Sequence, residues 1–324
     1  MNITIYTHTD ELPQLSSANY FHSPELMALY EQTPRHRPYM AVATDADGQV
    51  VAHMLAVERY HRPALLFSLV RQARILGEGV YVGDPDNGTR NMIFSAMLDA
   101  LTHRLQQRVL YVEVSHLSKK MFGYAPLRAA GFFPVKWMNV HNSLHSLSPE
   151  ERIMPRQQRH VSYSEKQGCH FKAVETEADF QAFSRLLRHH NWLKPRRYIP
   201  NDAFFRGMLQ TGHCRMFLTT YRQHVIGCSL YVFTDGDAYL WYSAARRKSF
   251  ATLHPNAFTF WNTIRYAYQE GCQHIRFMDV GLPFRRHPYR DFILSFGGKE
   301  VSTFRWFRIS IRWVNRLASW LWKE

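Results

Sequence analysis

The sequence has 324 residues, 46% of them hydrophobic, and its 40 Lys and Arg against 26 Asp and Glu give a formal net charge of +14. This length is enough for two domains with hydrophobic cores, and no apolar run approaches the roughly 20 residues that a membrane-spanning helix needs. The charge favours a polyanionic partner, namely RNA, a nucleotide or an anionic membrane surface, although a basic soluble protein without such a partner would have the same balance.

The 4 cysteines and 18 histidines are scattered along the chain. No CxxC pair or metal-ligand spacing occurs, so we expect free thiols in a reducing compartment and no metal site. The first residues, MNITIYTHTDELP, lack the basic and apolar regions of a signal peptide. These features predict a cytoplasmic protein.

Residues 1–147 alternate between strand and helix periods and predict a first domain. Ser23 and Pro24 have the residue types of a helix N-cap and first turn. The expected elements are strand 2–6, a helix from Pro24, hairpin 39–60, strand 61–75, helix 91–106, strand 109–114, helix 121–130 and strand 132–144.

A polar, basic junction follows at residues 148–170. Its cations, in and near a predicted helix, are Arg152, Arg156, Arg159, His160 and Lys166. Two interpretations are open: a solvated connecting helix, or one wall of an anion-binding cleft between domains.

A second domain is expected at residues 171–309. Its elements are strand 171–175, helix 177–190, helix 204–209, hairpin 215–233, strand 239–244, helix 255–270, strand 274–280, helix 290–296 and strand 301–309. The loop NWLKPRRYIP interleaves Arg196 and Arg197 with aromatic residues. Such a loop can hold a phosphate and stack a base, although ordinary surface charge explains it equally well.

The second half of the chain repeats the plan of the first. With a displacement of 166 residues (279 minus 113), Glu113 falls on Asp279, Gly131 on Gly297 and Val135 on Val301, without a gap. LYVEVSHL overlays RFMDVGLP, and the strand–turn–strand pattern upstream also recurs. A repeat of this length indicates a duplicated domain rather than a solenoid unit.

The tail at residues 310–324 predicts an amphipathic helix. Its apolar face carries Trp313, Val314, Leu317, Ala318 and Leu321, with arginines beside it. It either packs on the preceding domain or lies at a membrane interface, for which Trp and Arg around an apolar face are typical.

The order of elements resembles that of a GNAT acyltransferase domain, present twice. In tandem it resembles the FemABX-like group, which includes peptidoglycan-bridge aminoacyltransferases and BioF-like acetyltransferase-domain proteins. The local resemblances are LRAAGFF at 127–133, the basic MPRQQRH, WYSAA, FMDVG and YRDFILSFGG at 289–298. The resemblance implies an α/β (α+β) fold with two tandem GNAT-like domains, each a central mixed sheet flanked by helices.

The chain departs from the GNAT pattern where the long helix of each copy begins. Acetyl-CoA-dependent members have a glycine-rich pyrophosphate loop there, of the R/Q-x-x-G-x-G/A type, whose N–H groups meet phosphate at a helix N-terminus. The first copy has VGDPDNGTRN, which is acidic, and the second has RRKSFATLHPNA. Neither fits, which favours a donor held differently, such as an aminoacyl-tRNA.

Acyl transfer to an amine needs a neutral, positioned amine, donors for the oxyanion and a proton for the leaving group. The catalytic candidates are Asp279, which would orient or deprotonate the amine, Tyr242, and Lys299, which follows two glycines. A hydrogen-bonded structural carboxylate and core packing are the alternative roles of Asp279 and Tyr242. Precedent in the Fem-like group implies substrate-assisted transfer without an obligatory protein base.

The candidates for substrate binding are aromatic or charged. Trp241 would line the acyl pocket, and the cations ahead of the helix and in the next loop would meet phosphate, although a solvated basic face is the default for such runs. In the first copy, Glu113 and Tyr124 would receive the acceptor. The full set is Trp241, Arg196, Arg197, Arg246, Arg247, Lys248, Arg285, Arg286, Arg290, Glu113 and Tyr124.

Three functions remain open. The first is a Fem-like transferase that takes an acyl or aminoacyl group from aminoacyl-tRNA or acyl-CoA to an amine acceptor, such as a peptidoglycan or other cell-envelope precursor. The second is an acyl-CoA-dependent N-acetyltransferase of a small amine or amino sugar. The third is a non-catalytic protein that binds RNA or a membrane surface. The expected partners are therefore tRNA or CoA, an amine and, through the C-terminal helix, the inner face of the membrane; no permanently bound cofactor and no DNA are expected.

Overall fold

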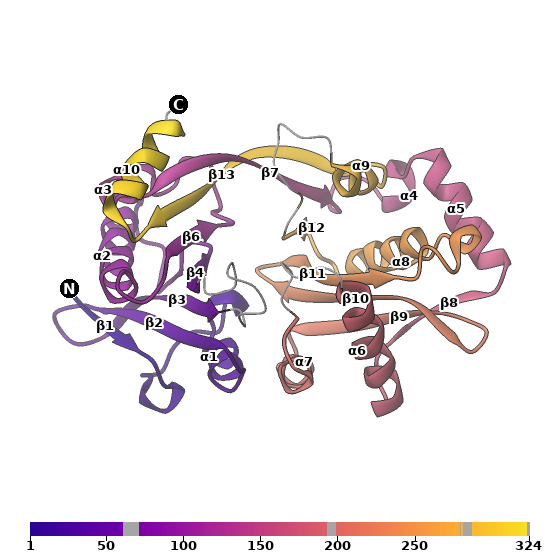
Figure 1. Ribbon diagram of the computed structural model, residues 1–324, viewed down its shortest axis with the longest axis horizontal. Coiled ribbons are helices and arrows are strands. Elements are labelled where there is room, and N and C mark those ends of the chain that lie inside the picture. Colours follow the sequence, from indigo (N-terminus) through magenta and orange to yellow (C-terminus); the bar gives the residue numbers. More distant parts are fainter. Residues whose placement is uncertain (61–70, 193–198, 279, 281–286, 323–324) are drawn as a thin grey trace. The chain divides into compact units, whose positions relative to one another are not determined.

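A computed structural model describes residues 1–324 apart from 61–70, 193–198, 279, 281–286 and 323–324. The chain divides into two compact units: Met1–Trp137 with Ser302–Glu324 form unit 1, and Met138–Val301 form unit 2. Both chain ends therefore belong to unit 1 (Figure 1). This division does not follow the boundaries at residues 147, 170 and 309 suggested by the sequence, because the C-terminal segment returns to the N-terminal unit and the basic junction joins unit 2.

Unit 1 contains one mixed sheet and four helices of more than one turn in its described residues. Its elements are β1 (Asn2–Tyr6), α1 (Pro24–Glu31), β2 (His36–Thr44), β3 (Val50–Tyr60), β4 (Arg71–Leu76), β5 (Val80–Tyr81), α2 (Asn87–Leu105), β6 (Tyr111–Ser115), α3 (Tyr124–Ala129), the start of β7 (Phe133–Ser143), the end of β13 (Lys299–Ile309) and α10 (Arg312–Leu321). The strand order is β1-β2-β3-β4-β6-β13, with β5 on β3. Strands β4 and β6 pair in parallel, and the other pairs described in this unit are antiparallel.

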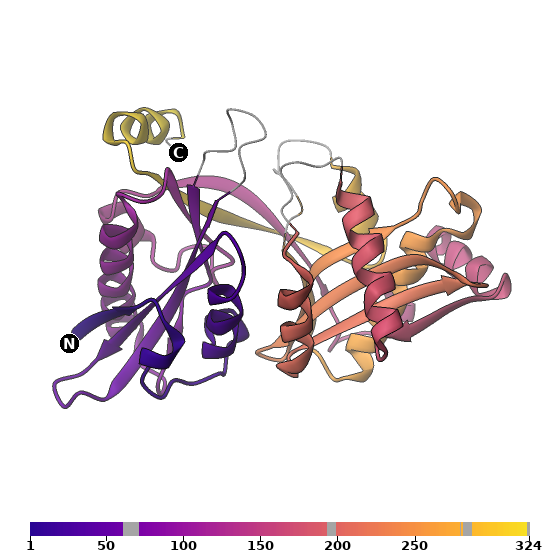
Figure 2. The same cartoon turned by 60° about the horizontal axis from the view of Figure 1, so that its bottom comes forward.

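Helices cover both faces of the unit 1 sheet (Figure 2). Alternate residues of β2 point to opposite faces: Tyr39 and Ala41 belong to the core cluster of α2, with Phe94 and Met97. On the other face, α1 packs on β2. Its N-terminus forms as predicted, since the Ser23 hydroxyl accepts from the backbone N–H of Leu26 at 3.1 Å.

Unit 2 has the same plan. Its elements are α4 (Pro149–Arg152), α5 (Pro155–Lys166), β8 (Cys169–Ala173), α6 (Glu177–Asn191), α7 (Asp202–Gln210), β9 (Cys214–Tyr221), β10 (His224–Thr234), β11 (Asp237–Ala245), α8 (Pro255–Gln269), β12 (His274–Phe277), α9 (Pro288–Leu294), the end of β7 and the start of β13. The strand order is β8-β9-β10-β11-β12-β7, in which β11 and β12 are parallel. Figure 2 shows α6 on the near face of this sheet and α8 behind it.

The two units are structural repeats, as the sequence predicts. Strands β7 and β13 begin at residues 133 and 299 and end at 143 and 309, so both ends are displaced by 166 residues. The long helices α2 and α8 and the short helices α3 and α9 occupy matching places. The predicted helix 255–270 is confirmed as α8, whereas the predicted helix 121–130 is shorter, because Gly123 with φ 62° precedes it.

The last strand of each copy, β7 in the first and β13 in the second, pairs with a strand of the other copy. Strand β7, which ends the first copy in sequence, pairs with β12 of unit 2, where Ser143 lies opposite His274. Strand β13, which ends the second copy, pairs with β6 of unit 1, where Phe307 lies opposite Glu113. The sequence analysis placed strand 132–144 as the completion of the first copy. Alternation of apolar residues indicates a strand but not its partner, so the exchange was not predicted.

Candidate functional site

Within the described residues, the parallel pairing of β11 and β12 ends where β11 carries a bulge. Their pairing runs from Asp237 opposite His274 to Leu240 opposite Phe277, while β11 continues to Ala245. On the other side of β11, Leu230 pairs with Tyr242 and Tyr231 with Leu240, so Trp241 is one extra residue. A β-bulge bends its strand and re-aims its side chains, and bulges are common beside active sites. The bulge at Trp241 therefore marks the position of the candidate site on β11.

Helix α7 packs aromatic side chains against this bulge. The ring of Tyr242, which is buried, lies 5.3 Å from that of Phe205, edge to face. The ring of Trp241 meets Phe204 at 6.4 Å, again edge to face. Both candidates from the sequence thus belong to one aromatic cluster between β11 and α7.

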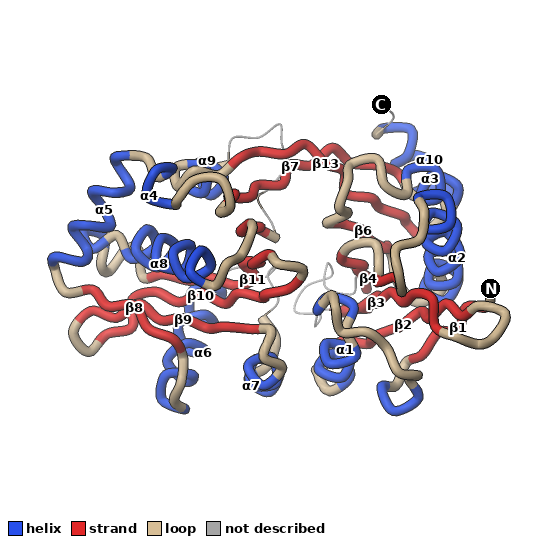
Figure 3. The backbone as a smooth tube through the Cα atoms, turned by 180° about the vertical axis from the view of Figure 1, so that it is seen from behind, coloured by secondary structure: helices blue, strands red, loops and turns tan. Residues whose placement is uncertain are grey.

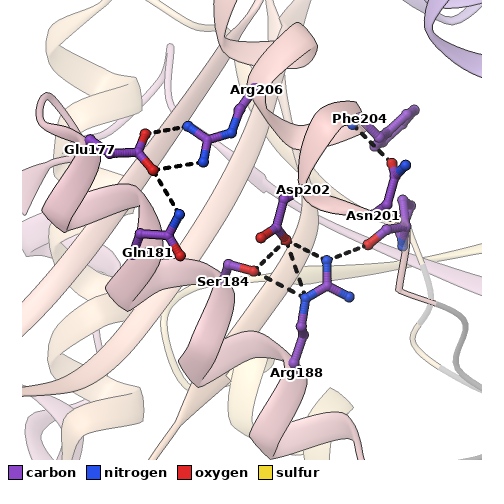
Figure 4. A network of polar contacts seen from close by, with 9 residues as sticks. Glu177, Gln181, Ser184, Arg188, Asn201, Asp202, Phe204 and Arg206 are labelled. Carbon is purple, nitrogen blue, oxygen red and sulfur yellow. Dashed lines mark hydrogen bonds and ion pairs between the residues drawn. The ribbon is translucent and has the colours of Figure 1, made fainter. Parts of the chain in front are cut away.

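A polar network holds α7 against α6 (Figure 4). Asp202 accepts from the Ser184 hydroxyl at 2.6 Å and pairs with Arg188, whose guanidinium also donates to the Pro200 carbonyl at 2.8 Å. Burial acts to raise the pKa of Asp202, but the hydrogen bonds from Ser184 and Arg188 outweigh it and keep this pKa below its ordinary value. The network thus joins α6 to the start of α7, and the predicted Arg196 and Arg197 lie outside the described residues.

Helix α8, which follows β11 after a turn and a 3-10 helix (Ala251–Leu253), has an open N-terminus. His254, its N-cap residue, has φ 42° and makes no side-chain capping bond, and Pro255 occupies the first turn. The first turn contains no acidic residue. The N–H groups of a first helical turn lack partners within the helix and carry partial positive charge, which makes such an end suitable for an anion.

Helix α5 packs beside α8 (Figures 1 and 3), and it carries Arg156 and Arg159. The imidazole of His160 stacks on that of His254 with ring centroids 3.8 Å apart. The Ser164 hydroxyl donates to the Leu253 carbonyl at 2.7 Å, which fixes α5 just ahead of α8. Burial, the neighbouring His254, Arg156 and Arg159 lower the pKa of His160. A bound anion would raise the pKa of His160, because its negative charge favours the protonated imidazole.

The turn between β11 and α8 supplies more positive charge. Arg246, Arg247 and Lys248 are all exposed. The turn is held by its backbone, since the N–H of Arg246 donates to the Ile226 carbonyl at 2.8 Å. We call the set Arg156, Arg159, His160, Arg246, Arg247, Lys248 and His254 the α8 cationic cluster.

The matching helix of unit 1 has a closed N-terminus. The Asp86 carboxylate accepts from the backbone N–H of Gly88 at 2.8 Å and of Thr89 at 3.2 Å. Hydrogen bonds from Thr89 and Gly88 lower the pKa of Asp86, so it is a carboxylate at neutral pH. It occupies the place of an anion at α2 and repels another. Only the second copy therefore offers a site for a phosphate group at its long helix within the described residues.

The remaining predicted residues lie elsewhere. Lys299 is exposed at the start of β13, and Arg290 is buried and pairs with Glu300 at 3.1 Å. Tyr124 packs edge to face on Trp306, with ring centroids 5.1 Å apart, beside the core of unit 1. Asp279, Arg285 and Arg286 lie outside the described residues.

Glu113 of unit 1 lies in a buried ion cluster. Its carboxylate is 3.2 Å from Arg74 and 3.4 Å from Arg305, and the guanidinium of Arg305 stacks on Trp137 at 4.0 Å. Burial acts to raise the pKa of Glu113, but the two arginines outweigh it and lower this pKa. This geometry suits a structural role that joins β13 to β6.

Two buried histidines of unit 1 make its stability depend on pH. Burial lowers the pKa of His22 to about 3 and that of His53 to about 4. Because these pKa values are lower in the folded state than in the unfolded state, the unfolded chain binds more protons between these values and about pH 6.5, and stability falls as pH falls.

We expect His53→Leu to weaken this dependence. As pH falls from about 7.5 to 5, each histidine should lower the free energy of unfolding by roughly 2 kcal/mol. The decrease caused by the two histidines should therefore be about half as large in the variant. Urea unfolding at the two pH values measures it. His103→Gln, on the exposed side of α2, is the control and should leave the slope unchanged; an unaltered slope in His53→Leu would contradict the assignment.

The sequence analysis missed two features of the site. It named His160 only as part of a basic junction and did not single out His254, and it did not expect the bulge at Trp241. The His-Pro dipeptide at 254–255, an N-cap followed by proline without a carboxylate, was the available signal. No local pattern indicates that α5 packs beside α8.

The arrangement of strands and helices matches solved structures of one fold. FemX superposes with a TM-score of 0.63 at 12% identity, covering 98% of this chain and 100% of that one. The C-terminal domain of a putative lysylphosphatidylglycerol synthetase from Agrobacterium fabrum gives 0.61 at 10% identity, covering 93% and 91%. A tandem GNAT protein from the clavulanic acid biosynthesis pathway gives 0.51 at 12% identity, covering 89% and 88%. The chain therefore has a tandem GNAT fold.

Sequence comparison adds one family. Residues 155–286 match the model of the acetyltransferase (GNAT) domain, so a GNAT domain occupies most of unit 2, including the α8 cationic cluster. A search of curated protein sequences found no match. The match and the fold therefore agree on a GNAT acetyltransferase domain in unit 2, which supports a transferase activity of that class.

Proposed function

We propose that the protein is an N-acyltransferase of the FemABX type, which moves an acyl or aminoacyl group from an anionic donor to an amine acceptor. One observation carries the proposal: the uncapped N-terminus of α8 lies among cations from α5 and from the turn directly after the bulged strand β11. Phosphates of the donor would bind at α8, and its acyl group would lie along β11 beside Trp241 and Tyr242.

In the proposed reaction the acceptor nitrogen attacks the acyl carbon. A C–N bond forms, and the bond from the acyl carbon to the ester oxygen of a tRNA, or to the sulfur of CoA, breaks. The proton lost by the amine passes to that oxygen or sulfur, so the step balances without a further reactant. Holding both reactants supplies a large part of the rate. Asp279 is proposed to orient the amine or take its proton.

Aminoacyl-tRNA is the donor that we favour. The turn RRKSFATLHP before α8 has no glycine and three adjacent cations, which suits the spread phosphates of an RNA better than the compact pyrophosphate of CoA. The acceptor we propose is an amine of a cell-envelope precursor. Both substrates are cytoplasmic molecules, so the proposal carries a cytoplasmic location with it.

Acyl-CoA is the second candidate, because the family model that matches residues 155–286 is that of an acetyltransferase. Its acceptor would be a small amine or amino sugar. In this case the N–H groups of Asn256 and Ala257 at the start of α8 would meet the pyrophosphate.

Binding of labelled tRNA and of acetyl-CoA across a salt series separates the two. We expect tRNA to bind with a steep decrease in affinity as salt rises, because several phosphates displace counterions, and we expect no saturable CoA signal. Saturable CoA binding, with tRNA bound no better than heparin, would replace the tRNA proposal by the acyl-CoA one. Binding of neither would contradict both and favour a non-catalytic role.

A further inference from the structure

Helix α10 is attached to unit 1 by its polar side. The Asn315 amide accepts from the backbone N–H of Ile309 at 2.8 Å and donates to the Gly131 carbonyl at 2.9 Å. Val314, Ala318 and Ser319 are half-buried on the same side. The sequence pattern placed Val314 and Ala318 on the apolar face with the tryptophans, but the structure turns them toward the unit.

The opposite side of α10 is an exposed apolar stripe. Trp313 is 70% exposed, Leu317 50%, Trp320 63% and Leu321 64%. These positions follow the i, i+4, i+7, i+8 spacing of one helical face. No residue of α10 is buried. We call these four side chains the α10 stripe.

Arginines flank the stripe. Arg312 and Arg316 are exposed, and α10 contains no carboxylate between residues 312 and 321. Arg308, at the end of β13, is half-buried, and burial and then Arg312 lower its pKa; Asp99 of α2 acts in the opposite direction. The exposed side of α10 is therefore both apolar and positively charged.

We propose that the α10 stripe inserts into the surface of an anionic phospholipid bilayer. Tryptophan and leucine on one face with arginine beside them suit the boundary between headgroups and acyl chains, and the arginines would meet lipid phosphates. Aromatic rings with a polar N–H are stable at such a boundary. No helix in the described part of the chain is long and apolar enough to cross a membrane. This inference does not depend on the proposed function.

A second copy of this chain is a poorer occupant of the stripe. In a two-fold dimer the same surface faces itself, so Arg312 and Arg316 of both copies would approach one another without a carboxylate on α10 to pair them. Lipid phosphates supply the negative charge that such a dimer lacks. The apolar stripe and the arginines beside it therefore favour an anionic bilayer over a second copy as the partner of α10.

Vesicle binding of the full chain tests the proposal. We expect cosedimentation with vesicles of phosphatidylcholine and phosphatidylglycerol, together with a blue shift of tryptophan emission, and much weaker binding to phosphatidylcholine alone. Trp313→Ser/Trp320→Ser should lower the affinity at least tenfold on both kinds of vesicle. Arg312→Gln/Arg316→Gln should lower it about fivefold for each arginine on the anionic vesicles only.

Controls separate the stripe from general effects. Trp192→Ser removes a tryptophan that is 80% exposed at the C-cap of α6 and should leave vesicle binding unchanged. Arg156→Gln/Arg159→Gln should do the same, which separates membrane binding from donor binding. All variants should unfold at the wild-type temperature, because none of these side chains is buried.

Three results would overturn the inference. The first is that the wild-type chain binds neither kind of vesicle, and the second is that Trp313→Ser/Trp320→Ser binds as well as the wild-type chain. The third is that light scattering shows a wild-type dimer which this variant dissociates, while the wild-type chain does not bind vesicles. The last result would assign the stripe to a second copy.

Discussion

Replacing Arg156 and Arg159 by glutamine should lower the affinity for the acyl donor by about 10- to 100-fold. Charge-assisted hydrogen bonds to phosphate contribute roughly 1.5–3 kcal/mol each, and exposure reduces this contribution. Both side chains are exposed and are in no ion pair among the described residues, so the free energy of unfolding should change by less than about 1 kcal/mol. Filter binding of tRNA, titration with acetyl-CoA and urea unfolding measure these effects.

The charge-matched control for this variant is Arg185→Gln/Lys136→Gln. These residues are exposed and lie on α6 and β7, so the change in net charge is the same but neither is at α8. An equal loss of affinity in the control would mean that only overall charge matters and would contradict a specific site. Arg246→Ala/Arg247→Ala should act in the same direction as Arg156→Gln/Arg159→Gln.

The stacked histidines make the same site sensitive to pH. Burial and neighbouring cations lower the pKa of His160 and of His254 in the free protein. A bound phosphate would raise both values, so donor binding takes up protons and the affinity increases as pH falls from about 8 to 6. The effect of pH should be smaller in His160→Gln, which checks that the histidines cause it.

Replacing Glu113 by alanine should destabilise the protein by about 3–5 kcal/mol. The change removes the carboxylate 3.4 Å from Arg305, whose side chain is 8% exposed, and breaking a buried ion pair by removing one partner is strongly destabilising. Urea unfolding measures the loss, and the control Glu150→Ala, which removes an exposed partner of Arg265, should cost less than about 1 kcal/mol. Adding Arg305→Leu to Glu113→Ala should restore part of the stability, because an apolar side chain replaces the buried guanidinium.

This experiment also separates a structural role of Glu113 from the acceptor-binding role suggested by the sequence. If Glu113 received the acceptor, Glu113→Gln would fold with normal stability and raise the KM for the amine. If it holds β13 against β6, as the ion cluster indicates, Glu113→Gln would lose stability before any change in KM is seen. The native pKa of Glu113 is lowered, so the stability that this residue contributes is present above its unfolded pKa and is lost as pH falls through the native value.

The sequence by itself determined the duplication and most of the elements. Ser23 and Pro24 specify the start of α1, and Phe258, Trp261 and Ile264 specify the buried face of α8, because helix caps and a 3.6-residue period depend only on near neighbours. The displacement of 166 residues was visible because both copies keep the same order of such local signals. That the turn before α8 does not fit the pattern of a pyrophosphate loop was also a local observation.

Only the tertiary structure decided which elements meet. Strands β7 and β13 have the alternating pattern of any strand, and their exchange depends on partners that lie more than 100 residues away in sequence. The stacking of His160 on His254 likewise joins two helices from distant segments. In α10, the same amphipathic pattern fits either a core-facing or an outward stripe. The Asn315 amide, which accepts a hydrogen bond from Ile309 and donates one to Gly131, holds the helix with the stripe outward. The helical period of the sequence does not indicate which way the stripe faces.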